Sequence, residues 1–260
     1  MDSNVFSAMM LTVLAGISTG IGSIIALFAK RTNTKFLSLS LGFSAGVMLY
    51  VSMIEIFSKA KDYLTAANGY TKGYWLCVIA FFAGIVIIGL IDFFVPSTES
   101  DIGSDITNKD NHLKRMGIMT AFAIAIHNFP EGMATFTSAL RDPRLGIAIA
   151  VAIAIHNIPE GIATSLPIYF STGKKGKAFL ISFLSGITEP IGAIVGYLIL
   201  RPFFNDTVFG ILFSAIAGIM VFIALEELIP MAHEYEKSKI TIIGVVIGMI
   251  VMAVSLLLFI

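Results

Sequence analysis

A six-residue pattern with the side chains of a metal site occurs twice in the middle of the chain. The copies are HNFPEG at residues 127–132 and HNIPEG at residues 156–161. Imidazole, carboxylate and amide oxygen are ligands that suit Zn²⁺, Fe²⁺, Mn²⁺ or Co²⁺. Both copies lie in otherwise apolar sequence, where a histidine and a carboxylate are costly unless something binds or neutralises them. The repeated pattern therefore predicts a bound cation.

Helical geometry would place the histidine and the glutamate of each copy together. Positions i and i+4 share a helix face, so His127 would lie beside Glu131, and His156 beside Glu160. The proline of each copy removes one backbone hydrogen bond. We therefore expect a kinked helix with ligand atoms and a locally loosened backbone at each copy.

The composition is that of a protein that crosses a membrane several times. Of 260 residues, 57% are hydrophobic and 13% are charged, the net charge is zero and the mean hydropathy is +0.90. Apolar runs of about 20 residues recur, which is the length that a helix needs to cross a bilayer. The alternation typical of a membrane β-barrel is missing from the sequence, and the zero net charge gives no argument for nucleic-acid binding. We expect one all-α membrane domain over residues 1–260, with eight spans near 5–29, 36–57, 74–95, 116–140, 145–170, 178–200, 208–231 and 240–260.

The basic residues of the loops predict an orientation. Lys and Arg are more numerous in the loops after odd-numbered spans than in those after even-numbered spans. The positive-inside rule then places the odd loops, including the polar loop 96–115, in the cytosol and both termini outside.

The central acids lack a basic partner in the sequence. Glu189-Pro190 adds a third carboxylate near the middle of a span, and no Lys or Arg lies near the centre of these spans. An unpaired charge at the bilayer centre is costly, so Glu131, Glu160 and Glu189 must be protonated, hydrated or bound to a cation from outside. Since the two motif copies fall at matched depth in antiparallel neighbours, we expect them to meet near the midplane, as in many secondary transporters.

Other polar residues carry weaker signals. Glu226 and Glu227 lie near the end of a span, and their role is left open between a site and the interface. His233 is more simply explained as a solvated helix end than as an exit-side metal station, and His112 as a solvated loop residue. From its surroundings alone, Met48 is interpreted as a core residue rather than a thioether ligand.

The doubled motif, the eight spans and the Glu189-Pro190 pair resemble the ZIP family of divalent-metal transporters over essentially the whole chain. The resemblance is closest to the family's bacterial zinc-uptake branch, and it implies that the protein lies in the plasma membrane of a bacterial cell, the inner membrane where there are two. It implies that spans 1, 4, 5 and 6 surround the metal path, that spans 1–3 and 6–8 are related by inversion (a 3+2+3 arrangement), and that the site is binuclear. Carried over by position, the ligands of one metal are His127, Glu131, His156, Glu160 and Met48. Those of the second are Asn128, Asn157 and Glu189, with Glu131 and Glu160 shared.

The leading hypothesis is a transporter that imports divalent metal, Zn²⁺ before Fe²⁺, Mn²⁺, Co²⁺ or Cd²⁺, and has no prosthetic group. Its expected partners are the metal and the bilayer, with a homodimer as one option for the assembly. The alternative is an intramembrane metal-dependent hydrolase, which needs an open metal position and a separate general base. The His-Glu-x-x-His pattern of zinc proteases is missing here. A third option, a metal-gated sensor, lacks an output domain in this sequence. We therefore expect a transporter and not an enzyme.

Overall fold

The computed structural model describes residues 3–28, 34–94, 109–200, 203, 205–235 and 239–257. Within these ranges the regular elements are all helical, which confirms the all-α prediction. They are α1 (Ser3–Phe28), α2 (Thr34–Tyr50), η1 (Val51–Ile56), α3 (Phe57–Asn68), α4 (Tyr70–Phe94), α5 (Lys109–Arg141), α6 (Pro143–Thr172), α7 (Lys175–Leu200), α8 (Asp206–Ile223), η5 (Ala224–Leu228), α9 (Ile229–Tyr235) and α10 (Ile240–Leu257).

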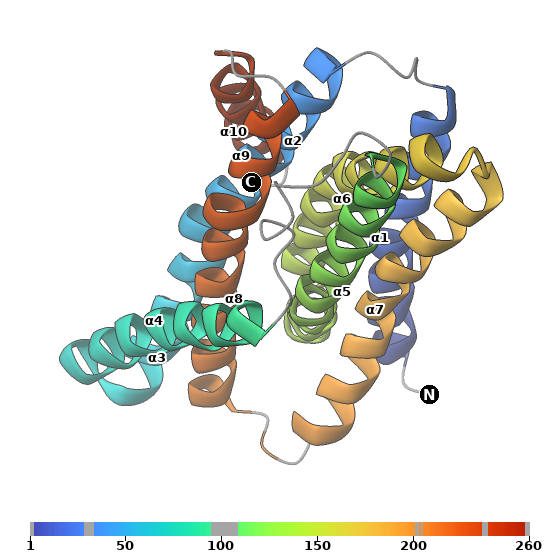
Figure 1. Cartoon of the computed structure of the whole chain (residues 1–260). Helices are drawn as coiled ribbons and strands as arrows, with labels where there is room; N and C mark the ends of the chain where they lie inside the picture. Colours follow the sequence, from blue (N-terminus) through green and yellow to red (C-terminus); the bar gives the residue numbers. More distant parts are fainter. Residues whose placement is uncertain are drawn as a thin grey trace.

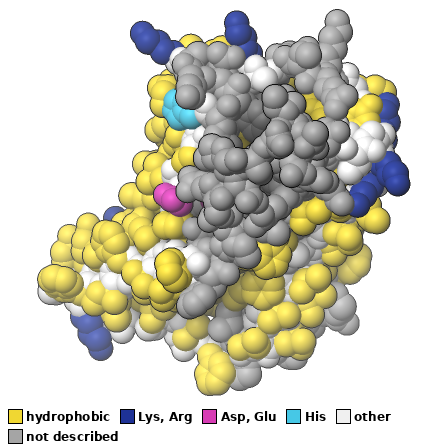
Figure 2. All heavy atoms as spheres, viewed as in Figure 1, with side chains coloured by type: hydrophobic (Ala, Val, Ile, Leu, Met, Phe, Trp, Pro, Cys, Tyr) yellow, Lys and Arg dark blue, Asp and Glu magenta, His cyan; other side chains and the backbone are white. Residues whose placement is uncertain are grey.

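Seven stretches of the described chain are helical, long and apolar enough to cross a membrane. The remaining expected span, 116–140, lies within α5, a helix of 33 residues that is less apolar than the other long helices. Exposed isoleucine, leucine, valine and phenylalanine side chains cover these helices. Figure 2 shows hydrophobic side chains over most of the described surface of one face, with Lys and Arg at its margins. This distribution fits a multi-pass protein surrounded by lipid.

The helices form two groups (Figure 1). Helices α1, α5, α6 and α7 pack on one another as a four-helix bundle. The flanking group consists of α2, η1, α3, α4, α8, η5, α9 and α10, and it meets the bundle chiefly where α2 packs on α6. The four helices of the bundle are the expected spans 1, 4, 5 and 6, so the motif copies lie inside it.

The turn between α5 and α6 marks one end of the molecule, which we call the turn end. Asp142 is the N-cap of α6, and its carboxylate accepts hydrogen bonds from the backbone N–H groups of Arg144 and Leu145. Pro143 occupies the first helical position, where its missing N–H costs nothing. This local chemistry ends α5 at Arg141 and starts α6 two residues later, so the two motif helices run antiparallel.

Two departures from regular helix were not predicted. Residues Val51–Ile56 and Ala224–Leu228 form π-helical segments, η1 and η5, between α2 and α3 and between α8 and α9. The first contains Glu55 and the second contains Glu226 and Glu227. Helix α3 then extends the second span beyond the expected residue 57, until Gly69, with φ of 80°, reverses the chain into α4.

Candidate metal centre

Glycines bring the motif helices close to their neighbours. A Cβ atom at Gly132 would overlap the backbone carbonyl of Glu189 in α7, and one at Gly161 would overlap the carbonyl of Thr19 in α1. Gly192 of α7 meets the carbonyl of Phe129 in the same way. Small residues of this kind let membrane helices approach at backbone distance. The glycine of each copy therefore fixes where its helix crosses α7 or α1.

The two motif copies meet through His156 and Glu131. Nε2 of His156 lies 3.2 Å from Oε1 of Glu131, and both side chains are fully buried. The two atoms are close without the alignment of a hydrogen bond. The imidazole of the second copy thus lies beside the carboxylate of the first, as a site shared between α5 and α6 requires.

Glu160 is reached from the flanking group. The hydroxyl of Ser44 in α2 lies 3.4 Å from Oε1 of Glu160 and 3.2 Å from the carbonyl oxygen of His156, and it donates toward both. Met48, one turn further along α2, is fully buried in the same core. Since i and i+4 share a helix face, Met48 lies on the Ser44 face of α2.

The side-chain amides of the two asparagines donate hydrogen bonds to neighbouring helices. Nδ2 of Asn128 donates to the carbonyl oxygen of Ser185 at 3.1 Å, and Nδ2 of Asn157 donates to that of Ala15 at 3.1 Å. Asn157 also donates to Oε1 of Glu189. These hydrogen bonds fix the orientation of both side-chain amides, and the oxygen of each amide accepts no hydrogen bond from the described residues.

Several buried oxygen atoms of the site accept no hydrogen bond from the described residues. They have no exposed surface to water, and each of them can act only as an acceptor when the carboxylates are ionised. A set of this kind lacks a donor and therefore suits a cation. The atoms are Oδ1 of Asn128, Oδ1 of Asn157, Oε1 and Oε2 of Glu131, and Oε2 of Glu189.

The charges of the site are not balanced by protein cations. Glu131, Glu160 and Glu189 are each fully buried, and the first two lie within electrostatic reach of Glu189. No lysine or arginine is among the buried side chains of the described chain. Since mutual repulsion and burial both oppose three ionised carboxylates, a proton or a metal ion must neutralise part of this charge.

Some of the expected residues lie outside this cluster or outside the described side chains. His127 belongs to α5, one turn before Glu131, but its side chain is not among those described, and the same holds for His112. Among the side chains that are described, no three His, Cys, Asp or Glu residues converge closely enough to hold a metal by themselves. Glu226 and His233 are exposed. The ligand set, including Met48, therefore stays a prediction, while the structure brings its asparagines and glutamates into one buried region.

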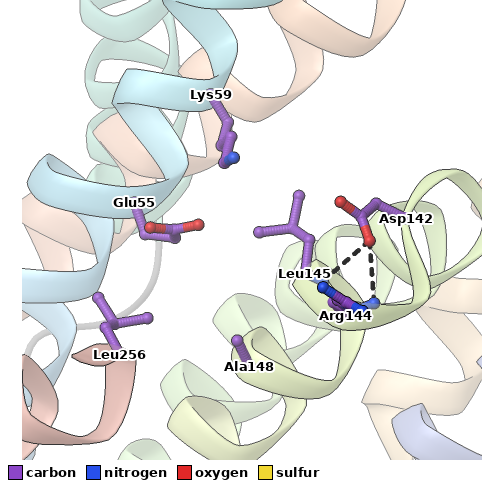
Figure 3. Close-up of a pocket in the computed structure, with 7 residues that line it drawn as sticks. All are labelled: Glu55, Lys59, Asp142, Arg144, Leu145, Ala148 and Leu256. Carbon is purple, nitrogen blue, oxygen red and sulfur yellow. Dashed lines mark hydrogen bonds between the residues drawn. The ribbon is translucent and has the colours of Figure 1, made fainter. Parts of the chain in front are cut away.

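A second polar region lies at the turn end. A pocket of about 270 Å³ is lined there by residues of η1, α3, the α5–α6 turn, α6 and α10 (Figure 3). Ala148 on its floor precedes His156 by eight residues, about 12 Å along α6. The pocket thus lies about two helical turns along α6 from the buried region that contains His156. The position of Glu55 near the end of a span is typical of an interface residue or of one that lines an entrance, and the packing of α2 on α6 places it in this pocket. The lining residues are Glu55, Lys59, Asp142, Arg144, Leu145, Ala148 and Leu256.

Comparisons with known proteins agree with these features. A family model described as ZIP Zinc transporter matches residues 96–256. A zinc transporter ZupT of Lysinibacillus sphaericus (strain C3-41) is 57% identical over the full length of both chains. That of Clostridium perfringens (strain 13 / Type A) is 58% identical, over 99% of this chain and 98% of its own. That of Streptococcus mutans serotype c is 58% identical over all of both chains.

Proposed function

The chain belongs to the ZIP family of zinc transporters, and from that premise we propose that its zinc is bound between α5, α6 and α7. The protein imports divalent metal, with zinc as the substrate of its relatives, and it is not an enzyme. The alternative of an intramembrane hydrolase has no support from these relatives. What remains is to assign the ligands, the path and the direction.

One observation carries the assignment. The amide oxygens of Asn128 and Asn157, both carboxylate oxygens of Glu131 and Oε2 of Glu189 are buried acceptors with no donor among the described residues. Water normally satisfies such groups, but these have no exposed surface. Divalent cations bound in this region would satisfy these oxygens and would offset the repulsion among the three carboxylates.

We assign two adjacent metal positions to this region. The 3.2 Å approach of His156 to Glu131 supports one of them, at the junction of the motif copies. The bond from Asn157 to Glu189 supports the other, nearer α7. The carboxylates of Glu131 and Glu160 would be shared. Residues of the first position are His127, Glu131, His156, Glu160 and Met48, and those of the second are Asn128, Asn157 and Glu189.

The direction of transport follows from the loop charges. The positive-inside rule places the turn end and both termini outside, so zinc would arrive at the turn end and leave at the opposite end. In this mechanism the four-helix bundle shifts against the flanking group. The ligands on α5, α6 and α7 travel with the bundle, whereas Met48 on α2 belongs to the flanking group. The homodimer stays a prediction that a single chain does not test.

The π-helical segments support the inverted 3+2+3 arrangement. Segment η1 interrupts span 2 after an α2 of 17 residues, and η5 interrupts span 7 after an α8 of 18 residues. Spans 2 and 7 would correspond under that symmetry. Because a π-helical segment is rare, two at equivalent positions are more simply explained by a shared ancestral unit than by coincidence.

Zinc uptake into proteoliposomes tests the assignment. We expect Glu131→Gln, which keeps the size of the side chain and removes its charge, to abolish uptake and lower the number of zinc ions bound at equilibrium. Glu226→Gln is the matched control, because this acid is exposed and lies in η5. Zinc uptake by Glu131→Gln at the wild-type rate would refute the site.

A further inference from the structure

The pocket at the turn end has walls of complementary charge. Glu55 and Lys59, on η1 and α3, form the wall that belongs to the flanking group. Asp142 and Arg144, at the start of α6, form the wall that belongs to the four-helix bundle. In Figure 3 the Glu55 and Lys59 side chains extend from one wall toward Leu145 and Asp142 on the other, and Leu145 lies between Glu55 and Arg144 in this view. None of these four described side chains makes an ion pair across the pocket.

Arg141, next to Asp142 in the same turn, is held in place by several contacts with the flanking group. Arg141, the last residue of α5, forms an ion pair with Asp206 at the start of α8. Its guanidinium carbon also lies 4.6 Å from the ring centroid of Tyr63 and 5.1 Å from that of Phe209. The ion pair and the two aromatic rings hold the end of α5 on the flanking group. One side of the turn is therefore fixed, while its other side faces an open, charged pocket.

We propose that this pocket is the outer gate of the zinc path. The gate closes when the α5–α6 turn moves toward η1. This movement would pair Glu55 with Arg144 and Lys59 with Asp142. The turn would rotate about Arg141, which stays bound to the flanking group. The inference rests on the proposed function, since it takes the turn end as the outer face. It goes beyond that function by naming the parts that exclude water once zinc is bound.

The position of the pocket supports this role. It lies at the end of the α2–α6 interface, and that interface contains Ser44, Glu160 and His156 further along. A hydrated cation that comes from the turn end must pass the level of Ala148 before it reaches His156. Opposite charges on walls that belong to different helix groups become neighbours only when the groups approach.

A charge swap tests the gate in proteoliposomes. Glu55→Arg places like charges opposite each other, and so does Arg144→Glu, whereas the double variant restores the attraction with reversed sign. We expect each single variant to lower the maximal uptake rate about fivefold. This is the fold-change that corresponds to the interaction energy of one partly exposed ion pair. The double variant should return to within about twofold of the wild type. The KM for zinc should stay unchanged in all three, because the buried ligands are untouched. A double variant no faster than the slower single variant would overturn the gate.

Labelling of a cysteine at the pocket floor measures closure directly. In a Cys77→Ala background, which removes the single cysteine, Ala148→Cys is treated with a membrane-impermeant maleimide on intact cells. We expect zinc to slow labelling about fivefold. Glu55→Arg should remove this protection and the charge swap should restore it. Labelling that is insensitive to zinc would overturn the gate, and so would protection that persists in Glu131→Gln, because zinc would then act on the cysteine itself.

These experiments separate the gate from the function on which it rests. If the unmodified chain carried no zinc, the proposed function would fail. If it carried zinc while the swap gave no recovery, the gate alone would fail. Glu226→Arg serves as a charge-matched control outside the pocket, and its uptake rate should equal that of the unmodified chain.

Discussion

Substitution of Gly132 by alanine should damage the metal centre without touching a ligand. The added Cβ would overlap the backbone carbonyl of Glu189. Neither partner is a flexible side chain that could move aside, so α5 and α7 must separate. Carbon atoms in contact normally lie about 3.5–4 Å apart, and the separation needed is therefore on the order of 1 Å.

A displacement of this size should disrupt metal–ligand distances strongly and reduce the stability of the fold only moderately. Overpacking of this kind typically costs about 1–3 kcal/mol, so the protein should fold with a lowered thermal midpoint. Metal–ligand distances, in contrast, tolerate only about 0.2 Å. Because Glu131 is on α5 and Glu189 on α7, we expect zinc uptake to fall at least about tenfold.

The assay compares two alanine variants. Uptake into proteoliposomes and the thermal midpoint in detergent are measured for Gly132→Ala and for Gly176→Ala. The second glycine lies in α7 and has open space around the position of a Cβ, so Gly176→Ala should behave as the unmodified chain. If Gly132→Ala kept the uptake rate of Gly176→Ala, the contact between α5 and Glu189 would not position the site.

Three other predictions concern the buried region and the contacts of Arg141. Ser44→Ala removes the donor to Glu160 and should raise the KM for zinc about two- to tenfold, the effect of about 0.5–1.5 kcal/mol, whereas an unchanged KM would separate α2 from the site. Lowering the pH from about 7 to about 5 should slow uptake, because protons compete with zinc for imidazole and carboxylate; faster uptake in acid would contradict these ligands. Arg141→Gln should lower the thermal midpoint by removing about 1–2 kcal/mol of ion-pair and cation–π attraction, with partial recovery in Arg141→Lys. An equal loss in Lys174→Gln, an exposed control, would show that charge alone is responsible.

The spans could be predicted because each depends on local sequence. Apolar runs of sufficient length locate the helices. Asp142 and Pro143 mark the start of α6, because aspartate is a common N-cap residue and proline is common at the first helical position. The contacts that the predicted ligands make with other helices could not be predicted in this way. Helical spacing pairs His156 with Glu160 on one helix, yet the structure also sets His156 beside Glu131 of the other copy and gives Glu160 a contact with Ser44. Such contacts depend on the rotation of each helix about its axis, which no single helix determines.

The π-helical segments and the turn-end pocket were also beyond sequence reasoning. A π-helical segment requires one extra residue in a helical turn, and the packing around the turn decides where it is stable. Residues 51–56 and 224–228 have no composition that marks them. Glu55 and Arg144 are far apart in the chain, and only the approach of η1 to the start of α6 makes them line the same pocket.

Under the proposed ligand assignment, the two asparagine hydrogen bonds have a consequence for ion selectivity. Because Asn128 is tied to the backbone of α7 and Asn157 to that of α1, neither amide oxygen can swing to follow an ion. A cage that cannot contract or expand favours ions of one radius, and it loses little conformational entropy when one binds. Discrimination between zinc and a larger ion such as Cd²⁺ would then reside in these tethers as much as in the chemistry of the ligands.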